Sequence, residues 1–375
     1  MKAGVITLYN VCNYGTQLQA YATQEKLKEY FEEVEFIQYK RKDTYGLGLL
    51  RTFTKGNPLK ILPILPTLIR WKTVFGGFQQ QFLKIADTSY TGKNGFDGFR
   101  DEYDVYLSGS DQVWNCGWNG GVVAPYYLSF APDRKPKYAF SSSFGQKRVE
   151  DEYISESKAY LERFDFITVR EESGVQILKE QYGYTKAKRI LDPTLLMTGD
   201  EWRRLAPDNT IPDDYILIYN LQRNRELDAY AEKIARKTGY TLYRFCTRYD
   251  QIFRNGKSLL IPDIFTFITL IDNASLVITD SFHATAFSMN LHTEPICIYP
   301  REYGGRISEF LQLVKEEGRH SRGYDDMDIL KRHVDFDRVD RILEMERKKA
   351  DEVLERTMGF IELRDGKGDY NNALC

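Results

Sequence analysis

The feature that most constrains the fold is a repeated alternation of short apolar runs with amphipathic helical patterns. In the first repeat, an apolar run at 4–8 precedes a polar turn, a helical pattern at 16–30 and a second apolar run at 34–39. A helix that connects two strands in this way makes them parallel, because the chain has to cross back over the sheet. The pattern therefore predicts an α/β fold built from βαβ units.

The alternation continues in two series that meet near 192–214. Further strands are expected at 105–107, 137–141, 166–169, 189–191, 215–219, 241–245, 276–279 and 294–299. Further helices are expected at 151–163, 171–182, 226–238, 264–272, 281–290, 306–317 and 337–358.

The length of the chain also argues for more than one domain. Its 375 residues exceed the size at which a single core usually stops growing. We predict an N-terminal α/β domain at 1–195, which includes a basic insertion at 44–86, and a second α/β domain at 196–335. A C-terminal helix and tail at 336–375 is expected to cross back to the first domain.

Composition excludes several classes of function. The net charge of −2, without a basic block, argues against nucleic acid as a partner. The five cysteines are scattered and never spaced as CxxC, so neither a disulfide framework nor a metal site is expected. A signal-peptide pattern is missing from the N-terminal residues and no apolar stretch reaches membrane-spanning length, so we expect a cytoplasmic protein.

One stretch within the first domain departs from the alternation. Residues 44–86 contain six Lys or Arg and no Asp or Glu, interleaved with Leu, Ile, Phe and Trp. Pro58, Pro63 and Pro66 argue against one continuous helix through its middle. Two interpretations stay open for this basic insertion. It either makes a peripheral contact with a membrane or a lipid-linked acceptor, or forms short helices packed on the first domain.

The segment Thr279–His283 is the strongest candidate for chemistry. Ligands of open parallel sheets bind at the carboxyl ends of strands, and this segment follows an apolar strand and begins a helix. Asp280 or Ser281 would cap that helix, whose free backbone N–H groups attract an anion. His283 would lie in the first turn and exchange protons with the bound molecule. The alternative is a capped helix whose histidine merely packs.

A second polar turn, at 108–115, also follows a predicted strand. Ser110 and Asp111 offer hydrogen bonds to a sugar, and Trp114 offers a flat face on which a sugar can stack. The alternative is a turn with an ordinary capping Asp. The loop before the first helix, which contains Asn13, Tyr14 and Gly15, is suited to hydroxyl recognition as well.

Two arginines are candidates for holding an anionic ligand. Arg170 lies between the end of a strand and the start of a helix, where a cation is out of keeping with the helix dipole. It would clamp a phosphate or carboxylate, or alternatively form a salt bridge with Glu171 or Asp192. Arg306 begins a helix after two glycines and could approach the same anion.

Together these segments resemble the polysaccharide pyruvyl transferase family. The resemblance rests on motifs in the family's order, across roughly residues 4–320: Asn13-Tyr14-Gly15 with Leu18-Gln19-Ala20, Gly109-Ser110-Asp111-Gln112-Val113-Trp114, Val169-Arg170-Glu171-Glu172-Ser173, Asp192-Pro193-Thr194, Thr279-Asp280-Ser281-Phe282-His283 and Arg306. It implies two Rossmann-like domains facing a cleft, in a GT-B-like architecture, with the acceptor on the side of 1–195 and the donor on the side of 196–335.

The resemblance also implies a reaction. A pyruvyl group would pass from phosphoenolpyruvate to hydroxyls of a sugar or lipid-linked glycan, giving a ketal and phosphate, with no cofactor or metal. His283 would be the acid/base and Arg170 would hold the donor. Many members have Arg-Leu-His where this chain has Ser281-Phe282-His283. The chain thereby loses one donor-binding cation, which we expect Arg306 to replace.

Two other functions are compatible with the same residues. The protein could be a glycosyltransferase of similar architecture that uses a nucleotide sugar, or a non-catalytic protein that binds glycans. The donor separates these alternatives, because only the first hypothesis requires phosphoenolpyruvate.

Overall fold

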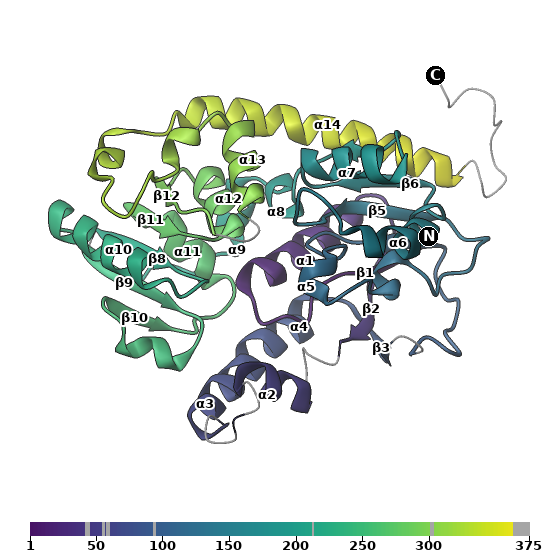
Figure 1. Cartoon of the computed structure of the whole chain (residues 1–375), viewed down its shortest axis with the longest axis horizontal. Helices are drawn as coiled ribbons and strands as arrows, with labels where there is room; N and C mark the ends of the chain where they lie inside the picture. Colours follow the sequence, from purple (N-terminus) through teal and green to yellow (C-terminus); the bar gives the residue numbers. More distant parts are fainter. Residues whose placement is uncertain are drawn as a thin grey trace.

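A computed structural model describes residues 1–41, 46–54, 57, 61–92, 95–211, 214–300 and 304–362 of the chain. Its strands form two separate sheets, side by side in Figure 1. The pairs within both sheets are parallel, as the helix-linked repeats predict.

The first sheet has seven strands in the order β3-β2-β1-β4-β5-β6-β7. They are β1 (Lys2–Ile6), β2 (Glu33–Lys40), β3 (Ile85–Thr91), β4 (Val105–Ser108), β5 (Lys137–Ser142), β6 (Phe166–Val169) and β7 (Lys188–Arg189). The second sheet has five strands in the order β10-β9-β8-β11-β12. They are β8 (Tyr215–Tyr219), β9 (Thr241–Cys246), β10 (Lys257–Leu260), β11 (Leu276–Thr279) and β12 (Pro295–Cys297).

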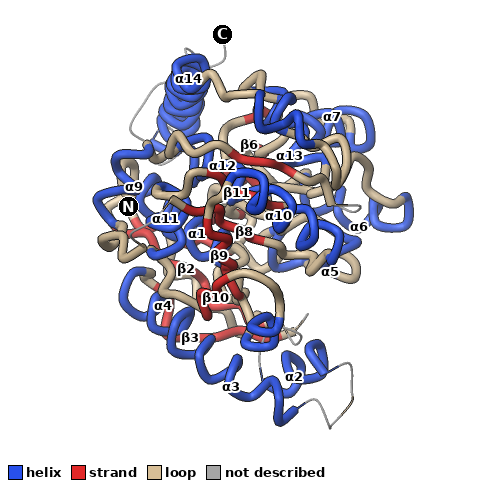
Figure 2. Tube along the Cα trace, turned by 90° about the vertical axis from the view of Figure 1, so that its left-hand side faces the viewer, coloured by secondary structure: helices blue, strands red, loops and turns tan. Residues whose placement is uncertain are grey.

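Helices cover both sheets, as Figure 2 shows from one end of the molecule. In the first half they are α1 (Tyr14–Leu27), α2 (Gly46–Thr54), α3 (Ile61–Trp71), α4 (Gly77–Phe82), α5 (Cys116–Asn119), α6 (Asp151–Leu161) and α7 (Glu172–Tyr182). In the second half they are α8 (Pro193–Leu196), α9 (Gly199–Leu205), α10 (Arg225–Thr238), α11 (Thr266–Asp272), α12 (Phe282–Asn290), α13 (Gly305–Leu313) and α14 (Phe336–Glu362).

The strand order of each sheet determines where a ligand can bind. In both sheets the order reverses beside the first strand, between β1 and β4 and between β8 and β11. The loops that leave neighbouring strands at such a point diverge to opposite faces and open a crevice. The predicted candidates Asn13, Asp111 and His283 all follow one of these four strands.

The helix α14 connects the two halves, and Figure 1 shows it lying along both of them. Asp351 on α14 forms an ion pair with Lys26 of α1, with 2.8 Å between the charged atoms. Arg347 donates hydrogen bonds of 2.8 Å to the carbonyl of Leu195 and to the side chain of Asn290 on α12. The helix α14 therefore contacts elements from both halves of the chain.

The basic insertion is mostly helical, and one of its prolines is accommodated unexpectedly. The helices α2 and α3 are separate, but Pro58, the proline between them, lies outside the described residues. Pro63 lies in the first turn of α3, where proline is tolerated, and Pro66 lies inside this helix. A proline removes the hydrogen bond to the carbonyl four residues earlier, here that of Leu62. Both residues are exposed, so water can satisfy that carbonyl. The helix continues through a π-helical turn at Lys72–Gly76 into α4.

Candidate active site

His283 is positioned by the strand–turn–helix segment predicted from the sequence. Ser281 is the N-cap of α12, and its hydroxyl accepts a hydrogen bond of 3.3 Å from the backbone N–H of Ala284. The imidazole Nε2 lies 3.8 Å from a carboxylate oxygen of Asp192 and has no hydrogen-bond partner among the described residues. Burial lowers the pKa of His283, although Asp192 and Asp111 oppose that shift. The ring is therefore neutral at pH 7.

Gly15 provides the space that the imidazole occupies. It lies in the first turn of α1, which Asn13 caps by accepting a hydrogen bond from the N–H of Thr16. A Cβ atom at Gly15 would lie 2.2 Å from Nδ1 of His283. Only glycine allows the backbone of the first domain to approach the ring of the second domain so closely.

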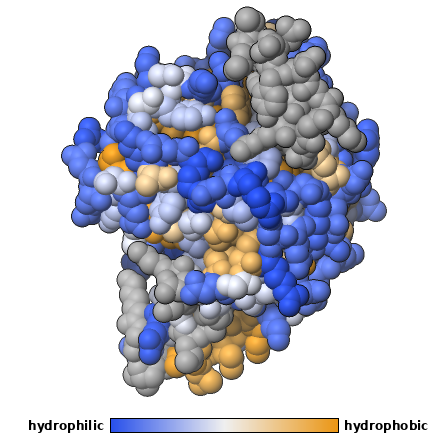
Figure 3. All heavy atoms as spheres, turned by 90° about the vertical axis from the view of Figure 1, so that its right-hand side faces the viewer, coloured by the Kyte–Doolittle hydropathy of each residue, from blue (hydrophilic) through white to orange (hydrophobic). Residues whose placement is uncertain are grey.

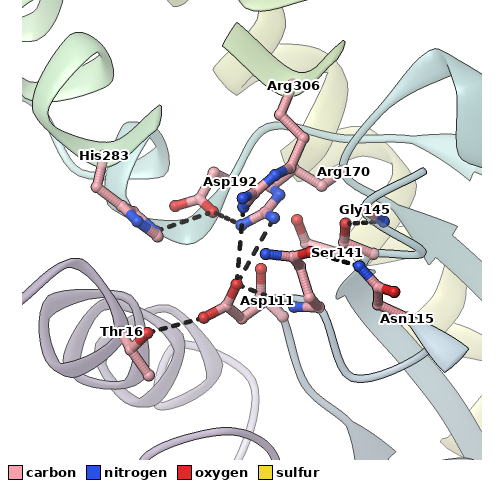
Figure 4. A network of polar contacts seen from close by, with 12 residues as sticks. Thr16, Asp111, Asn115, Ser141, Gly145, Arg170, Asp192, His283 and Arg306 are labelled. Carbon is pink, nitrogen blue, oxygen red and sulfur yellow. Dashed lines mark hydrogen bonds and ion pairs between the residues drawn. The ribbon is translucent and has the colours of Figure 1, made fainter. Parts of the chain in front are cut away.

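Arg170 is held by three carboxylates, of which Figure 4 labels those of Asp111 and Asp192. Its Nε donates to Glu171 at 2.9 Å, and its Nη1 donates to Asp192 at 2.7 Å. Burial disfavours the charge, but Glu171, Asp192 and Asp111 outweigh it and raise the pKa of Arg170. The salt-bridge alternative for Arg170 is therefore realised. Only Nη2 lacks a hydrogen bond in the described structure, so this nitrogen is the one left for a ligand.

Asp111 links the turn after β4 to this network. Its backbone adopts φ 71°, a left-handed conformation that is rare for residues other than glycine and is often found at functional sites. The hydroxyl of Thr16 donates to its carboxylate at 2.9 Å, and Nη2 of Arg170 lies 3.7 Å away. Burial alone would raise the pKa of Asp111, but Arg170, His283 and Arg306 lower it. Asp111 is therefore an anion at neutral pH.

Arg306 is the less neutralised of the two arginines. Its Nη1 lies 4.0 Å from Asp111, and its Nε has no hydrogen-bond partner within the described ranges. Burial and the neighbouring Arg170 lower the pKa of Arg306 to about 10, so it stays charged at pH 7. The guanidinium groups of Arg170 and Arg306 lie 4.9 and 5.8 Å from the ring centroid of Phe282. This aromatic ring partly offsets the repulsion between the two cations.

These groups border a cavity of about 590 Å³ between the two domains. Five of the residues predicted from the sequence line it: Asn13, Asp111, Ser281, His283 and Arg306. An adjoining cavity of about 330 Å³ shares Phe282 and Arg306 with it and is also lined by Arg170. The crevice at the two strand-order reversals thus contains a cavity with charged side chains in its walls.

Four of the six predicted acceptor residues do not line this cavity: Tyr14, Gly15, Ser110 and Trp114. Trp114 was predicted to stack on a sugar, but it is fully buried, its ring stacks on Tyr127 at 5.5 Å, and its N–H donates to the carbonyl of Tyr126. Tyr14 is fully buried too, and its hydroxyl donates to the carbonyl of Pro262 in the other domain at 2.6 Å. Ser110 is also buried. The chain turns inward after Asp111, which carries Trp114 into the core.

Other residues of the cavity were not predicted from the sequence. Trp118 is 40% exposed and lines the cavity with Phe53 of α2, and the guanidinium of Arg41 lies 4.8 Å from the Trp118 ring. The available signal was Asn115, which caps α5 by accepting from the N–H of Trp118. An N-cap at Asn115 predicts a short helix at 116–119, in which Trp118 points outward.

Asp280 does not cap α12, because Ser281 does. Its carboxylate instead accepts hydrogen bonds from the backbone N–H groups of Leu221 and Gln222, at 2.7 and 2.9 Å. Burial raises the pKa of Asp280. The residue thus ties the loop after β8 to the start of α12. Within the described parts of the chain, no group of three metal-ligating side chains is close enough together to hold a metal.

The two sheets and the site between them define a class: two Rossmann-like domains facing a cleft, with a GT-B-like architecture. A putative UDP-N-acetylglucosamine 2-epimerase from Listeria monocytogenes has a similar structure, with a TM-score of 0.58, 12% identity and 99% of each chain covered. The UDP-GlcNAc 2-epimerase of Methanocaldococcus jannaschii is similar at a TM-score of 0.55 and 13% identity, covering 96% of this chain and 100% of that one. At these identities the similarity concerns the fold.

The sequence identifies the family within this class. The chain belongs to the polysaccharide pyruvyl transferase family, whose sequence model matches residues 13–302. No curated protein matches the sequence. The matched range contains Asn13, Asp111, Arg170, Asp192 and His283 and ends just before Arg306.

Proposed function

We propose that the protein transfers a pyruvyl group from phosphoenolpyruvate to two hydroxyls of a sugar in a polysaccharide or its lipid-linked precursor. Family membership supports this reaction. One structural observation carries it. Three buried nitrogens, Arg170 Nη2, His283 Nε2 and Arg306 Nε, have no hydrogen-bond partner in the described structure and belong to one cluster. Buried polar atoms without partners are rare, so such a cluster indicates a ligand.

The donor has the charges that this cluster lacks. Phosphoenolpyruvate has a phosphate and a carboxylate, and either group suits Arg306 and the open edge of Arg170. The N-terminus of α12 adds the positive end of its dipole beside the hydroxyl of Ser281. Since Glu171 and Asp192 neutralise Arg170, Arg306 supplies the cation that this chain lacks at Ser281.

His283 moves the proton in the proposed reaction. The methylene carbon of phosphoenolpyruvate takes up a proton and becomes a methyl group, which makes the central carbon oxocarbenium-like. A sugar hydroxyl attacks that carbon, and the imidazole of His283 takes the proton of the hydroxyl, which replaces the proton given to the methylene carbon. Phosphate leaves with its bonding electrons, and the second hydroxyl attacks the oxocarbenium-like carbon and loses its own proton. The products are the pyruvate ketal and inorganic phosphate.

The acceptor enters from the side of the first domain in this proposal. Trp118 supplies an aromatic face for a sugar ring, and Asn13 and Asp111 supply polar groups from the first domain. Aromatic faces with nearby hydrogen-bonding groups suit sugars, which have apolar ring faces and polar edges.

The test is release of phosphate from phosphoenolpyruvate in the presence of the host's own glycan. The wild-type protein is expected to release phosphate and label the glycan with pyruvate. His283→Ala is expected to lose about 10²–10⁴-fold in rate, the usual cost of removing a proton-transfer group. Its circular dichroism should match that of the wild type. Undiminished phosphate release by the folded variant would contradict the proposed mechanism.

Similarity in fold to UDP-GlcNAc 2-epimerases supports a second candidate, a glycosyltransferase that uses a nucleotide sugar. It predicts that UDP or UDP-GlcNAc raises the melting temperature of the protein and that phosphoenolpyruvate does not. A non-catalytic glycan-binding protein would respond to the glycan and to neither donor.

A further inference from the structure

The helix α3 is apolar on two opposite sides. Ile64, Thr67 and Trp71 face inward and are buried. On the outer side Leu62 is 79% exposed, Leu65 44% and Ile69 61%. These three positions are spaced three and four residues apart, so they form one stripe along the helix. A helix with apolar residues on all sides is normally covered on all sides.

This stripe lies at one end of the molecule, where Figure 3 has a hydrophobic patch at the height of α2 and α3 in Figure 1. The short helical segment Tyr249–Phe253 packs against α3, and the N–H of Tyr249 donates to the hydroxyl of Thr67 at 3.1 Å. That segment also exposes large apolar side chains, with Phe253 89% and Ile252 49% exposed. Two neighbouring elements therefore present apolar side chains to the surroundings.

The charge around the stripe is positive. Residues 44–86 contain six Lys or Arg and no Asp or Glu, whereas the whole chain has a net charge of −2. Arg51 on α2 and Lys72, directly after α3, are both exposed, whereas Arg70 forms an ion pair with Asp263 at 3.2 Å. Apolar side chains flanked by basic ones are characteristic of helices that lie in the interface of an anionic membrane. Of the helices in the described ranges, none has the length and apolar character needed to span a membrane.

The surface lies close to the candidate active site. Phe53 of α2 lines the active-site cavity. A further cavity of about 470 Å³, lined by Leu50, Leu68 and Trp71 among others, lies between α2, α3 and the loop before α1. That loop borders both cavities, with Asn10 and Cys12 on the apolar one and Val11 and Asn13 on the active-site one. The loop before α1 thus connects the surroundings of α3 with the cleft.

We infer that the outer face of α3 docks the protein on an anionic membrane surface, with Leu62, Leu65 and Ile69 inserted among the lipids. The inference of docking rests on residues 44–86 and on the neighbouring segment Tyr249–Phe253. That it brings a lipid-linked glycan to the cleft rests on the proposed function.

Binding to vesicles tests the docking without donor or acceptor. The full chain is expected to sediment with vesicles of phosphatidylglycerol and phosphatidylcholine. The triple variant Leu62→Ser, Leu65→Ser, Ile69→Ser is expected to bind them at least about tenfold more weakly, since three apolar side chains no longer enter the interface. The matched control is Met345→Ser, which removes an exposed apolar side chain (52%) from α14. It should bind like the wild type.

The charge is tested separately with Arg51→Glu combined with Lys72→Glu. Each lost basic residue should weaken binding about fivefold, and phosphatidylcholine alone should bind the wild type poorly. Equal binding by the wild type and the triple variant would overturn the inference. So would a wild-type dimer, detected by light scattering, that the triple variant converts to monomers. Failure of phosphate release in solution would instead count against the proposed function.

Discussion

Two turns contribute to the cleft, one from each sheet, and they use their aromatic residues differently. Each follows a buried parallel strand next to a reversal of strand order, the first after β4 and the second after β11. After β4, the polar Asp111 faces the cleft and Trp114 enters the core. After β11, both Phe282 and His283 line the cavity. The position at a strand end therefore identifies the loop, and the backbone after it decides which side chains reach a ligand.

The backbone explains the difference between the turns. The left-handed conformation of Asp111 redirects the chain, so that Trp114 packs beneath the turn. At the second turn, Ser281 starts a helix at once, and the first helical residues Phe282 and His283 project toward the other domain. Four variants separate these roles, and they follow in order of expected effect.

Trp114→Ala should affect stability and leave the chemistry in place. Removing a fully buried tryptophan costs about 3–5 kcal/mol of unfolding free energy. Urea denaturation measures that loss. At a temperature where the variant is folded, its KM for the glycan should stay within about twofold of the wild-type value, because a residue in the core does not contact the bound glycan. A large rise in KM without loss of stability would restore Trp114 as the sugar-stacking residue.

Gly15→Ala should have the reverse effect. The added methyl group overlaps the imidazole, and a displacement of about 1 Å costs about 10²-fold in rate. Gly77→Ala is the matched control, because a Cβ atom there meets no atom within 4 Å and the residue is helical. That control should keep full activity and gain up to about 1 kcal/mol of stability. Full activity of Gly15→Ala would show that the ring position is not critical.

Ser281→Ala tests the cap of the second turn. Losing the cap should lower the unfolding free energy by about 0.5–2 kcal/mol. Ser281→Asp should recover the stability, because aspartate is also a good N-cap residue. Its negative charge should nevertheless weaken binding of the anionic donor. Equal donor affinity in the alanine and aspartate variants would remove Ser281 from the donor site.

The pH dependence of stability is the smallest expected effect. Burial lowers the pKa of His283 below its ordinary value of 6.5, so the unfolded chain takes up a proton before the folded one does. Stability should therefore be complete above pH 6.5 and fall on acidification, by up to about 1.4 kcal/mol per pH unit. His283→Gln should flatten that part of the curve in denaturation experiments from pH 7 to about pH 5. Identical curves for the wild type and His283→Gln would mean that the pKa of His283 is the same in the folded and the unfolded chain.

Much of the fold follows from local sequence patterns. The strands at 215–219 and 276–279 have the predicted bounds, because they are central and apolar throughout. The strands β3 and β10 were not predicted. Both lie at sheet edges, where partly exposed residues such as those of β3 give no apolar run. The helix α9 was also missed, although Thr198 and Glu201 form a capping box that signals its start.

The site was predictable only as far as it is local. Ser281 and His283 were placed correctly on a helix start, because capping and helical period depend on neighbours in sequence. The fit of Gly15 against His283 depends on how the two domains pack, and no spacing in the sequence predicts the distance between these two residues. Arg170 was left open between a ligand clamp and a salt bridge. Two of its three carboxylates, those of Asp111 and Asp192, come from separate loops that only the folded chain brings close to Arg170. The domain boundaries at 195 and 335 stay predictions.

Calorimetric titration of the purified protein with phosphoenolpyruvate and, separately, with UDP tests the central claim most directly. We predict that phosphoenolpyruvate binds and UDP does not. Arg306→Met should weaken phosphoenolpyruvate binding about 10–100-fold, the usual value of a charged hydrogen bond. The control Arg341→Met, at an exposed position on α14, should leave binding unchanged. Binding of UDP without binding of phosphoenolpyruvate, or undiminished phosphoenolpyruvate binding by Arg306→Met, would contradict the account.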